Sequence, residues 1–188
     1  MNKSITDGTA LLIMDVQAGI IDRAHNKDDY LAEVRKIIDF AHQINLPVIL
    51  VVVGFRMGVP EISTSNKMFG AIKAATPSTF IEPQPLISPL ENDVVILKRR
   101  VSAFSGSDLE IILRAKNISH LILTGISTSG VVLSTLREAA DKDYHITVLS
   151  DLCADADEEV NKVLLEKVFP RQATVITSDR WISEQTRS

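Results

Sequence analysis

Two ionisable residues at the ends of apolar runs are the first candidates for chemistry in this sequence. Asp15 follows the first apolar run, and Lys98 follows the run of residues 94–97. A carboxylate in apolar surroundings must find a partner or change its pKa, so Asp15 is suited to proton transfer. A nearby ammonium lowers the pKa of an aspartate and burial raises it. The sequence therefore leaves open whether Asp15 acts as a general acid or as a general base.

A third candidate is the segment of residues 121–135, LILTGISTSGVVLST, in which an apolar run stops at Gly125 and a helical pattern follows. A strand that turns sharply into a helix directs backbone N–H groups at one point, and enzymes often place a nucleophile there. Val131 stands just inside the expected helix and has no nucleophilic atom. The turn can therefore orient a substrate or a water molecule through its N–H groups, but Val131 cannot attack.

The hydroxyl groups of Ser127, Thr128 and Ser129 are the remaining nucleophiles at this turn. A serine nucleophile needs a base to activate it. Among the histidines, only His25 follows a strand closely enough to reach this edge of a sheet. Structural capping of the helix is therefore the favoured interpretation of these hydroxyls.

The three candidates require a parallel sheet to bring them together. Apolar runs alternate with helical patterns along the chain, which is typical of a doubly wound α/β protein with a parallel sheet covered on both faces. Such a sheet binds ligands beyond the carboxyl ends of its strands, where all three candidates would lie. We expect one domain over residues 1–188, with strands at residues 10–16, 48–53, 94–97, 121–123, 146–149 and 174–176.

The turn also resembles a motif of the isochorismatase-like hydrolases, a family that includes nicotinamidases and N-carbamoylsarcosine amidases. The family pattern is close to G-[IV]-[AS]-T-x-x-C-V-x-x-T, and it is matched here by Gly125, Ile126, Ser127, Thr128, Val132 and Thr135. The likeness extends through LLIMDVQ (residues 11–17), LKRRVSAFSGSDLE (residues 97–110) and SDLCAD (residues 150–155).

This resemblance implies an isochorismatase-like fold, with a mainly parallel six-stranded sheet and helices on both faces. It assigns the catalytic positions to Asp15, Lys98 and Val131, the last standing where the family has its nucleophilic cysteine. It further implies a cis peptide bond between Ile126 and Ser127, and a homo-oligomer.

Loops at the expected edge supply the candidate substrate-binding residues. Arg56 could pair with a substrate carboxylate, although an exposed loop charge is the alternative. Arg99 and Arg100 are expected to be solvated. The irregular stretch of residues 54–92 is interpreted either as a pocket wall or as a surface excursion. The substrate-binding candidates are Gln17, Phe55, Arg56, Phe69, Phe104, Ile126, Ser127 and Ser129.

Composition excludes several other functions. The net charge of -4 argues against a nucleic-acid binder, and no apolar run approaches the length of a membrane span. Cys153 is the only cysteine, which excludes an internal disulfide, and its expected role is structural. Nicotinamidases carry metal ligands after the second strand, but residues 54–69 contain no histidine. We therefore expect no metal, no cofactor and a cytoplasmic location.

The sequence as a whole favours a hydrolase that acts on a small molecule without a cysteine nucleophile. Isochorismatases hydrolyse a vinyl ether, and by resemblance Asp15 would deliver the proton that this reaction needs. Two alternatives stay open at this point. One is an amide or ester hydrolase that uses activated water, and the other is a non-catalytic relative that binds a small molecule or a partner.

Overall fold

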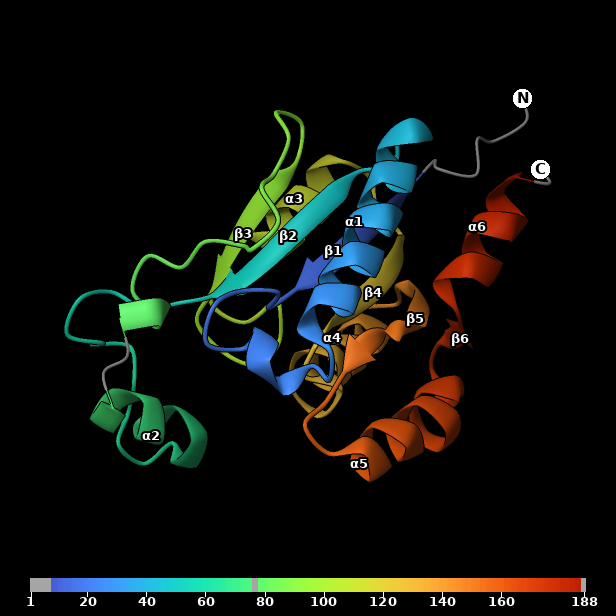
Figure 1. Cartoon of the computed structure of the whole chain (residues 1–188). Coiled ribbons are helices and arrows are strands. Elements are labelled where there is room, and N and C mark those ends of the chain that lie inside the picture. The colour runs from blue at the N-terminus through green and yellow to red at the C-terminus, as the bar shows by residue number, and fades with distance from the viewer. Residues whose placement is uncertain (1–7, 76–77, 187–188) are drawn as a thin grey trace.

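The computed structural model describes residues 8–75 and 78–186, and it is built around a six-stranded sheet in which every strand pair is parallel (Figure 1). The strand order is β3-β2-β1-β4-β5-β6. This confirms the predicted doubly wound α/β fold. The strands are β1 (Thr9–Met14), β2 (Val48–Val53), β3 (Val94–Lys98), β4 (His120–Ile126), β5 (His145–Ala154) and β6 (Thr174–Ile176).

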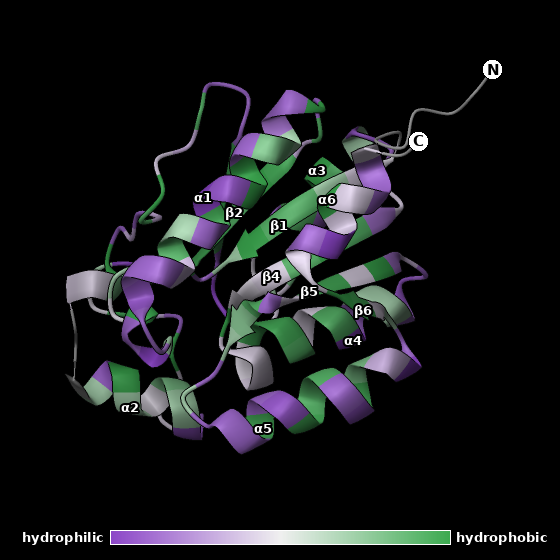
Figure 2. Ribbon diagram, turned by 45° about the vertical axis from the view of Figure 1, so that its right-hand side comes forward, coloured by the Kyte–Doolittle hydropathy of each residue, from purple (hydrophilic) through white to green (hydrophobic). Residues whose placement is uncertain are grey.

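The central strands are apolar throughout because both faces of the sheet are covered. Every residue of β1 and β2 is buried. Successive side chains alternate between the two faces, so Leu11 and Ile13 enter one core while Ala10 and Leu12 enter the other. In Figure 2 the central strands are accordingly mostly green, whereas helix α1 (Lys27–Gln43) carries purple residues along its length.

Helices on the two faces complete the layers. Helix α1 and helix α6 (Ser178–Thr186) contribute to one core, and α3 (Leu109–Ala115) and α4 (Leu133–Asp141) contribute to the other. Helix α5 (Glu158–Val163) has no buried residue. None of the helices within residues 8–75 and 78–186 is long and apolar enough to cross a membrane.

The segment between β2 and β3 carries helix α2 (Lys67–Ala75) and the short 3-10 helix η2 (Ser78–Phe80). Figure 1 shows α2 standing away from the sheet, beyond the end of β2. An isolated bridge between Phe55 and Ile81 joins two parts of this segment, and a second bridge, between Gln17 and Pro85, ties the segment to the chain that follows β1. The segment is therefore anchored at both ends while α2 reaches out over the edge of the sheet.

The strand order reverses direction at β1, which lies between β2 and β4. In open α/β sheets, ligands bind in the crevice at such a switch point, outside the carboxyl ends of the strands. Register pairs Met14 with Val51 on one side and with Gly125 on the other. Asp15 and the turn after β4 therefore meet at one edge, as the sequence predicts.

Gly125 is required where β4 passes β1. Its φ of +147° is one that side-chain-bearing residues rarely adopt, and an added Cβ would stand 2.4 Å from the carbonyl oxygen of Met14.

We predict that Gly125→Ala lowers the free energy of unfolding by about 2 kcal/mol or more, measured by urea denaturation. Gly130→Ala is the matched control, because its Cβ would meet its nearest neighbour at 3.6 Å. Equal unfolding midpoints for the two variants would contradict this explanation.

Candidate active site

The centre of the candidate site is a buried ion pair between Asp15 and Lys98. The Lys98 ammonium lies 2.9 Å from Asp15 Oδ2, and it also donates a hydrogen bond of 2.9 Å to the carbonyl oxygen of Arg100. Strand β2 separates β1 from β3, so the long lysine side chain spans from one strand end to the other. Lys98 is only 1% exposed and Asp15 only 5%, so the pair meets away from bulk water.

Burial dominates the electrostatics of this pair. It raises the pKa of Asp15 to about 6, against the lowering effects of Lys98 and, more weakly, of Arg23. Burial also lowers the pKa of Lys98, while Asp15 acts in the opposite direction. Within the described chain, Asp15 Oδ1 is a buried side-chain atom without a hydrogen-bond partner. One carboxylate oxygen is therefore held by lysine while the other is unpartnered.

The ion pair opens onto a cavity of about 260 Å³. Its polar lining comes from Asp15, Lys98, Arg23 and Ser127. Most of the remaining wall is apolar, and α2 contributes a large part of it. The predicted site residues Ile126 and Val131 also line the cavity, as do Ile20, Val53, Met68, Phe69, Ala71, Ile72, Phe80, Val101 and Gly130. Within the stretch of residues 54–92, α2 and Phe80 thus form a pocket wall, which is one of the two interpretations proposed for it.

The turn after β4 has the predicted cis peptide bond between Ile126 and Ser127. Several of its backbone N–H groups, however, already donate hydrogen bonds within the protein. The N–H groups of Gly130 and Val132 donate to the carbonyl oxygen of Ser127, and that of Ser129 donates to Asp155 Oδ2 at 2.7 Å. The sequence predicted that the turn as a whole offers N–H donors to a substrate, but these three N–H groups are not free to do so.

The hydroxyl groups of the turn are engaged as well, though not as helix caps. Ser127 Oγ accepts a hydrogen bond of 3.0 Å from Arg23, and its side chain makes no cap bond. Thr128 Oγ1 donates to Asn161 Oδ1 at 2.6 Å. Asp155 takes the capping role that the sequence analysis assigned to the hydroxyls. His25 lies outside the cavity, 3.5 Å from Glu158, and so is not placed to activate them.

Of the predicted substrate-binding residues, Phe69, Ile126 and Ser127 line this cavity, and the other five do not. Gln17 binds both backbone groups of Val53, at 3.0 and 2.8 Å, and so fastens the ends of β1 and β2 together. Arg56 is exposed and pairs with Glu61 at 2.6 Å, which is the alternative interpretation of this residue. Phe104 packs near Tyr144 in the core on the face covered by α3 and α4. Ser129 is engaged by its backbone, as described above.

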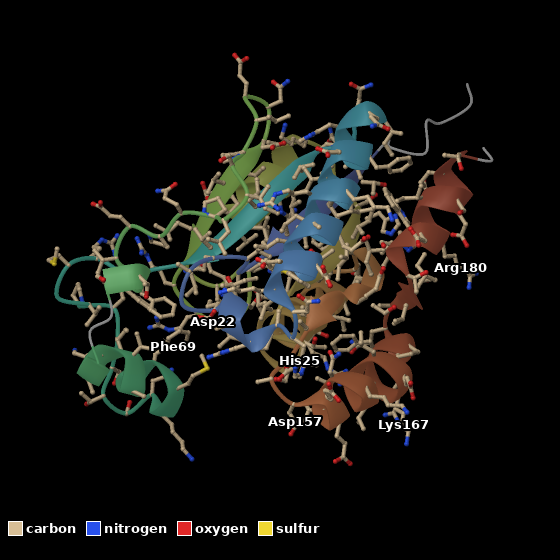
Figure 3. The ribbon with its side chains drawn as sticks, viewed as in Figure 1. Asp22, His25, Phe69, Asp157, Lys167 and Arg180 are labelled. Atoms are coloured by element: carbon tan, nitrogen blue, oxygen red, sulfur yellow. The ribbon has the colours of Figure 1, made fainter. Side chains whose placement is uncertain are left out.

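Phe55 supports the cavity wall from behind. Its ring centroid lies 5.6 Å from that of Phe69 and 6.4 Å from that of Phe80, and both of those rings line the cavity. Figure 3 labels Phe69, which lies on α2, and Asp22, which precedes Arg23 in the chain. An aromatic cluster thus connects α2 to the end of β2.

Arg99 and Arg100 are not solvated surface charges, contrary to expectation. Arg99 Nη1 donates to the carbonyl oxygen of Gly54, and Arg100 Nη2 donates to that of Glu61 at 2.7 Å. The Arg100 guanidinium also lies 5.8 Å from the centroid of the Phe69 ring. The basic run that begins at Lys98 therefore holds the pocket wall against the sheet.

The thiol of Cys153 and the possible metal ligands of the described chain lie outside this cavity or form no cluster. Cys153 does not line it, and burial raises the pKa of its thiol well above the ordinary value. This agrees with a structural role. Within the described ranges, no group of three or more histidine, cysteine, aspartate or glutamate side chains could hold a metal ion. The absence of a cofactor stays a prediction.

Sequence reasoning missed Arg23, which lies in the short 3-10 helix η1 (Ile21–Arg23). No motif marks this arginine, and only its position soon after Asp15 could have suggested it. On α2 the sequence predicted Phe69 but missed the other wall residues, Met68, Ala71 and Ile72, because no local pattern shows that this helix folds back to the cavity.

A doubly wound parallel sheet with an acid and a cation buried at its switch point defines the class of this protein as an open-sheet α/β protein. The sequence model of the isochorismatase domain matches residues 9–180. The chain belongs to the isochorismatase family, whose members include isochorismatase-like hydrolases.

Individual relatives agree over nearly the whole chain. YecD of Escherichia coli O157:H7, an uncharacterized isochorismatase family protein, is 29% identical over 89% of this chain and 90% of its own. An isochorismatase family protein from Burkholderia thailandensis has a TM-score of 0.77 at 26% identity, covering 96% of each chain. The N-carbamoylsarcosine amidase from Thermoplasma acidophilum has a TM-score of 0.72 at 26% identity, over 91% of this chain and 96% of that one.

The electrostatics of the pair can be tested by titration. We predict that Asp15, followed by carboxyl ¹³C NMR, titrates with a midpoint near pH 6. Lys98→Met should raise this midpoint, because it removes the charge and the hydrogen bond that lower the pKa of Asp15. Lys36→Met, at an exposed lysine that pairs with Asp179, should leave it unchanged. A wild-type midpoint at the ordinary value of 3.8 would contradict the dominance of burial.

Proposed function

We propose that this protein is a hydrolase that cleaves a vinyl ether in a small carboxylic acid, with Asp15 as the general acid and without a covalent intermediate. The observation that carries the proposal is Asp15 Oδ1, a buried carboxylate oxygen without a partner in the described chain, on the wall of a cavity. A carboxyl oxygen without a protein partner can carry the proton of the neutral acid, which is the form that the proposed reaction requires. Family membership supports hydrolysis as the type of reaction.

The elevated pKa of Asp15 suits a proton donor. A pKa of about 6 leaves a useful fraction of the carboxyl groups protonated near neutral pH, whereas an ordinary aspartate would have lost its proton. The apolar wall formed by Val131 and the aromatic residues disfavours the charged form further. The open question from the sequence, whether Asp15 is an acid or a base, is answered in this proposal in favour of the acid.

The proposed reaction begins when Asp15 transfers its proton to the terminal methylene carbon of the vinyl ether. The electron pair of the double bond forms the new C–H bond and leaves an oxocarbenium ion. Water adds to the positive carbon and returns a proton to the Asp15 carboxylate, which gives a hemiketal. Collapse of the hemiketal releases pyruvate and an alcohol, so that one water molecule is consumed and no thiol is needed.

Lys98 has two parts in this scheme. Its ammonium stabilises the carboxylate that Asp15 becomes after proton transfer, at the 2.9 Å distance of the ion pair. It also fixes the position of the carboxyl group on the cavity wall, because it holds Oδ2 and leaves Oδ1 as the oxygen without a partner in the described chain. Catalysis by positioning and electrostatics is consistent with a site in which Val131 has no reactive group.

The proposal predicts that the protein releases pyruvate from isochorismate, measured by coupling to lactate dehydrogenase and following NADH. Asp15→Asn should lower kcat by roughly 10²- to 10⁴-fold, the usual contribution of a general acid. The rate should fall as the pH rises through about 6, because the proton required for the first step is then lost from Asp15.

Cys153→Ala is the matched control, since its thiol is buried and lies outside the cavity. It should retain turnover within a few-fold, whereas a nucleophilic thiol would make its loss as severe as that of Asp15. If wild-type protein binds isochorismate saturably but forms no pyruvate, the catalytic proposal fails. The non-catalytic binding relative would then be the better description.

A further inference from the structure

Arg23 is a cation on the cavity wall that the proposed reaction does not use. It ends η1 and is exposed, whereas Asp15 is buried in the same cavity. Arg23 Nη1 donates to Ser127 Oγ at 3.0 Å. Among residues 8–75 and 78–186, no carboxylate forms an ion pair with Arg23, although other arginines such as Arg56 and Arg180 have one.

The guanidinium group therefore keeps most of its donors for a ligand. Arginine presents its N–H groups as a planar fork that matches a carboxylate, and only one nitrogen is bound by Ser127. That single bond leaves the group oriented. Among the described residues, the cavity is lined by two cations, Lys98 and Arg23, and by one carboxyl group, that of Asp15, so its wall carries a surplus positive charge whether Asp15 is ionised or protonated. A ligand that completes this site is an anion.

We propose that Arg23 is the specificity-determining residue of the cavity, where it binds a carboxylate of the small-molecule substrate while Ser127 holds the guanidinium in place. This assignment deepens the proposed function, on which it rests for the reaction but not for the binding. The apolar body of the ligand lies against Phe69, Ile72 and Phe80. Neutral analogues of the same shape are discriminated against because they cannot satisfy the arginine charge.

The placement of the charges also explains how such a substrate would be oriented. Of the residues that line the cavity, Arg23 is exposed to solvent, whereas Asp15 is buried. A carboxylate bound by Arg23 therefore directs the rest of the molecule inwards. The reacting carbon then lies nearer to Asp15 Oδ1 than the carboxylate does, and the two like charges stay apart.

Benzoate and benzamide are suitable probes because they share a shape and differ in charge. We expect wild-type protein to bind benzoate more tightly than benzamide, measured by isothermal titration calorimetry at low salt. Arg23→Met should weaken benzoate binding by roughly tenfold or more while leaving benzamide binding within about twofold. Arg180→Met is the matched control, because Arg180 lies on α6 on the opposite side of the molecule (Figure 3).

Two further variants make the outcome decisive. Ser127→Ala should weaken benzoate binding less than Arg23→Met, because the charge stays and only its orientation is lost. Arg23→Lys should likewise give an intermediate affinity, since a lysine retains the charge without the planar fork. The two variants therefore separate the contribution of the positive charge to benzoate affinity from the contribution of its geometry.

Several results would overturn the assignment. Wild-type protein without a preference for benzoate would do so, as would unchanged benzoate affinity in Arg23→Met. Loss of both ligands in both Arg23→Met and Arg23→Lys would show that the arginine supports the cavity wall instead. Failure of the proposed function is separable, because absent pyruvate release from isochorismate leaves the benzoate measurements unaffected.

Discussion

The buried contact between Asp15 and Lys98 is the interaction on which the organisation of this protein's site depends. Removing two charges from water is costly, and each of these residues offsets part of that cost for the other. The contact is possible only because β1, β2 and β3 are parallel neighbours, so that a lysine at the end of β3 reaches across β2. The pairing leaves one oxygen of Asp15 unpartnered, and it leaves burial as the strongest influence on its pKa. The chemistry proposed for the site follows from this asymmetry between the two oxygens.

The wall of the cavity depends on a second set of contacts, which bring a long connection back to the sheet. Arg99 and Arg100 bind carbonyl oxygens of residues 54–61, and Phe55 packs against the rings contributed by α2 and η2. Gln17 ties the ends of β1 and β2 together through the backbone of Val53. These residues resemble binding residues in a sequence because they are polar or aromatic and lie on loops. In the folded protein they position the wall, and the cavity itself is lined by other side chains, most of them apolar.

The turn after β4 shows how a motif can retain its shape while its polar groups are redistributed. Gly125 allows close passage past Met14, and the cis bond that follows agrees with the family resemblance. Asp155 binds the N–H of Ser129, and Arg23 binds the hydroxyl of Ser127, so two segments far apart in sequence converge on this turn. With Val131 inside the cavity, the turn contributes shape and an apolar surface, and the charged groups come from β1, β3 and η1.

The sequence by itself determined the doubly wound fold, the strand positions and the convergence of Asp15, Lys98 and Val131 on one edge. Apolar periodicity and strand ends depend on local residue types, and the rule for parallel sheets then supplies the shared edge. Only the tertiary structure decided that Arg23 lines the cavity, that Arg56 and Phe104 do not, and that Arg99 and Arg100 hold loops. Which way a loop side chain points depends on partners distant in sequence, such as Ser127 for Arg23, and no local pattern encodes those partners.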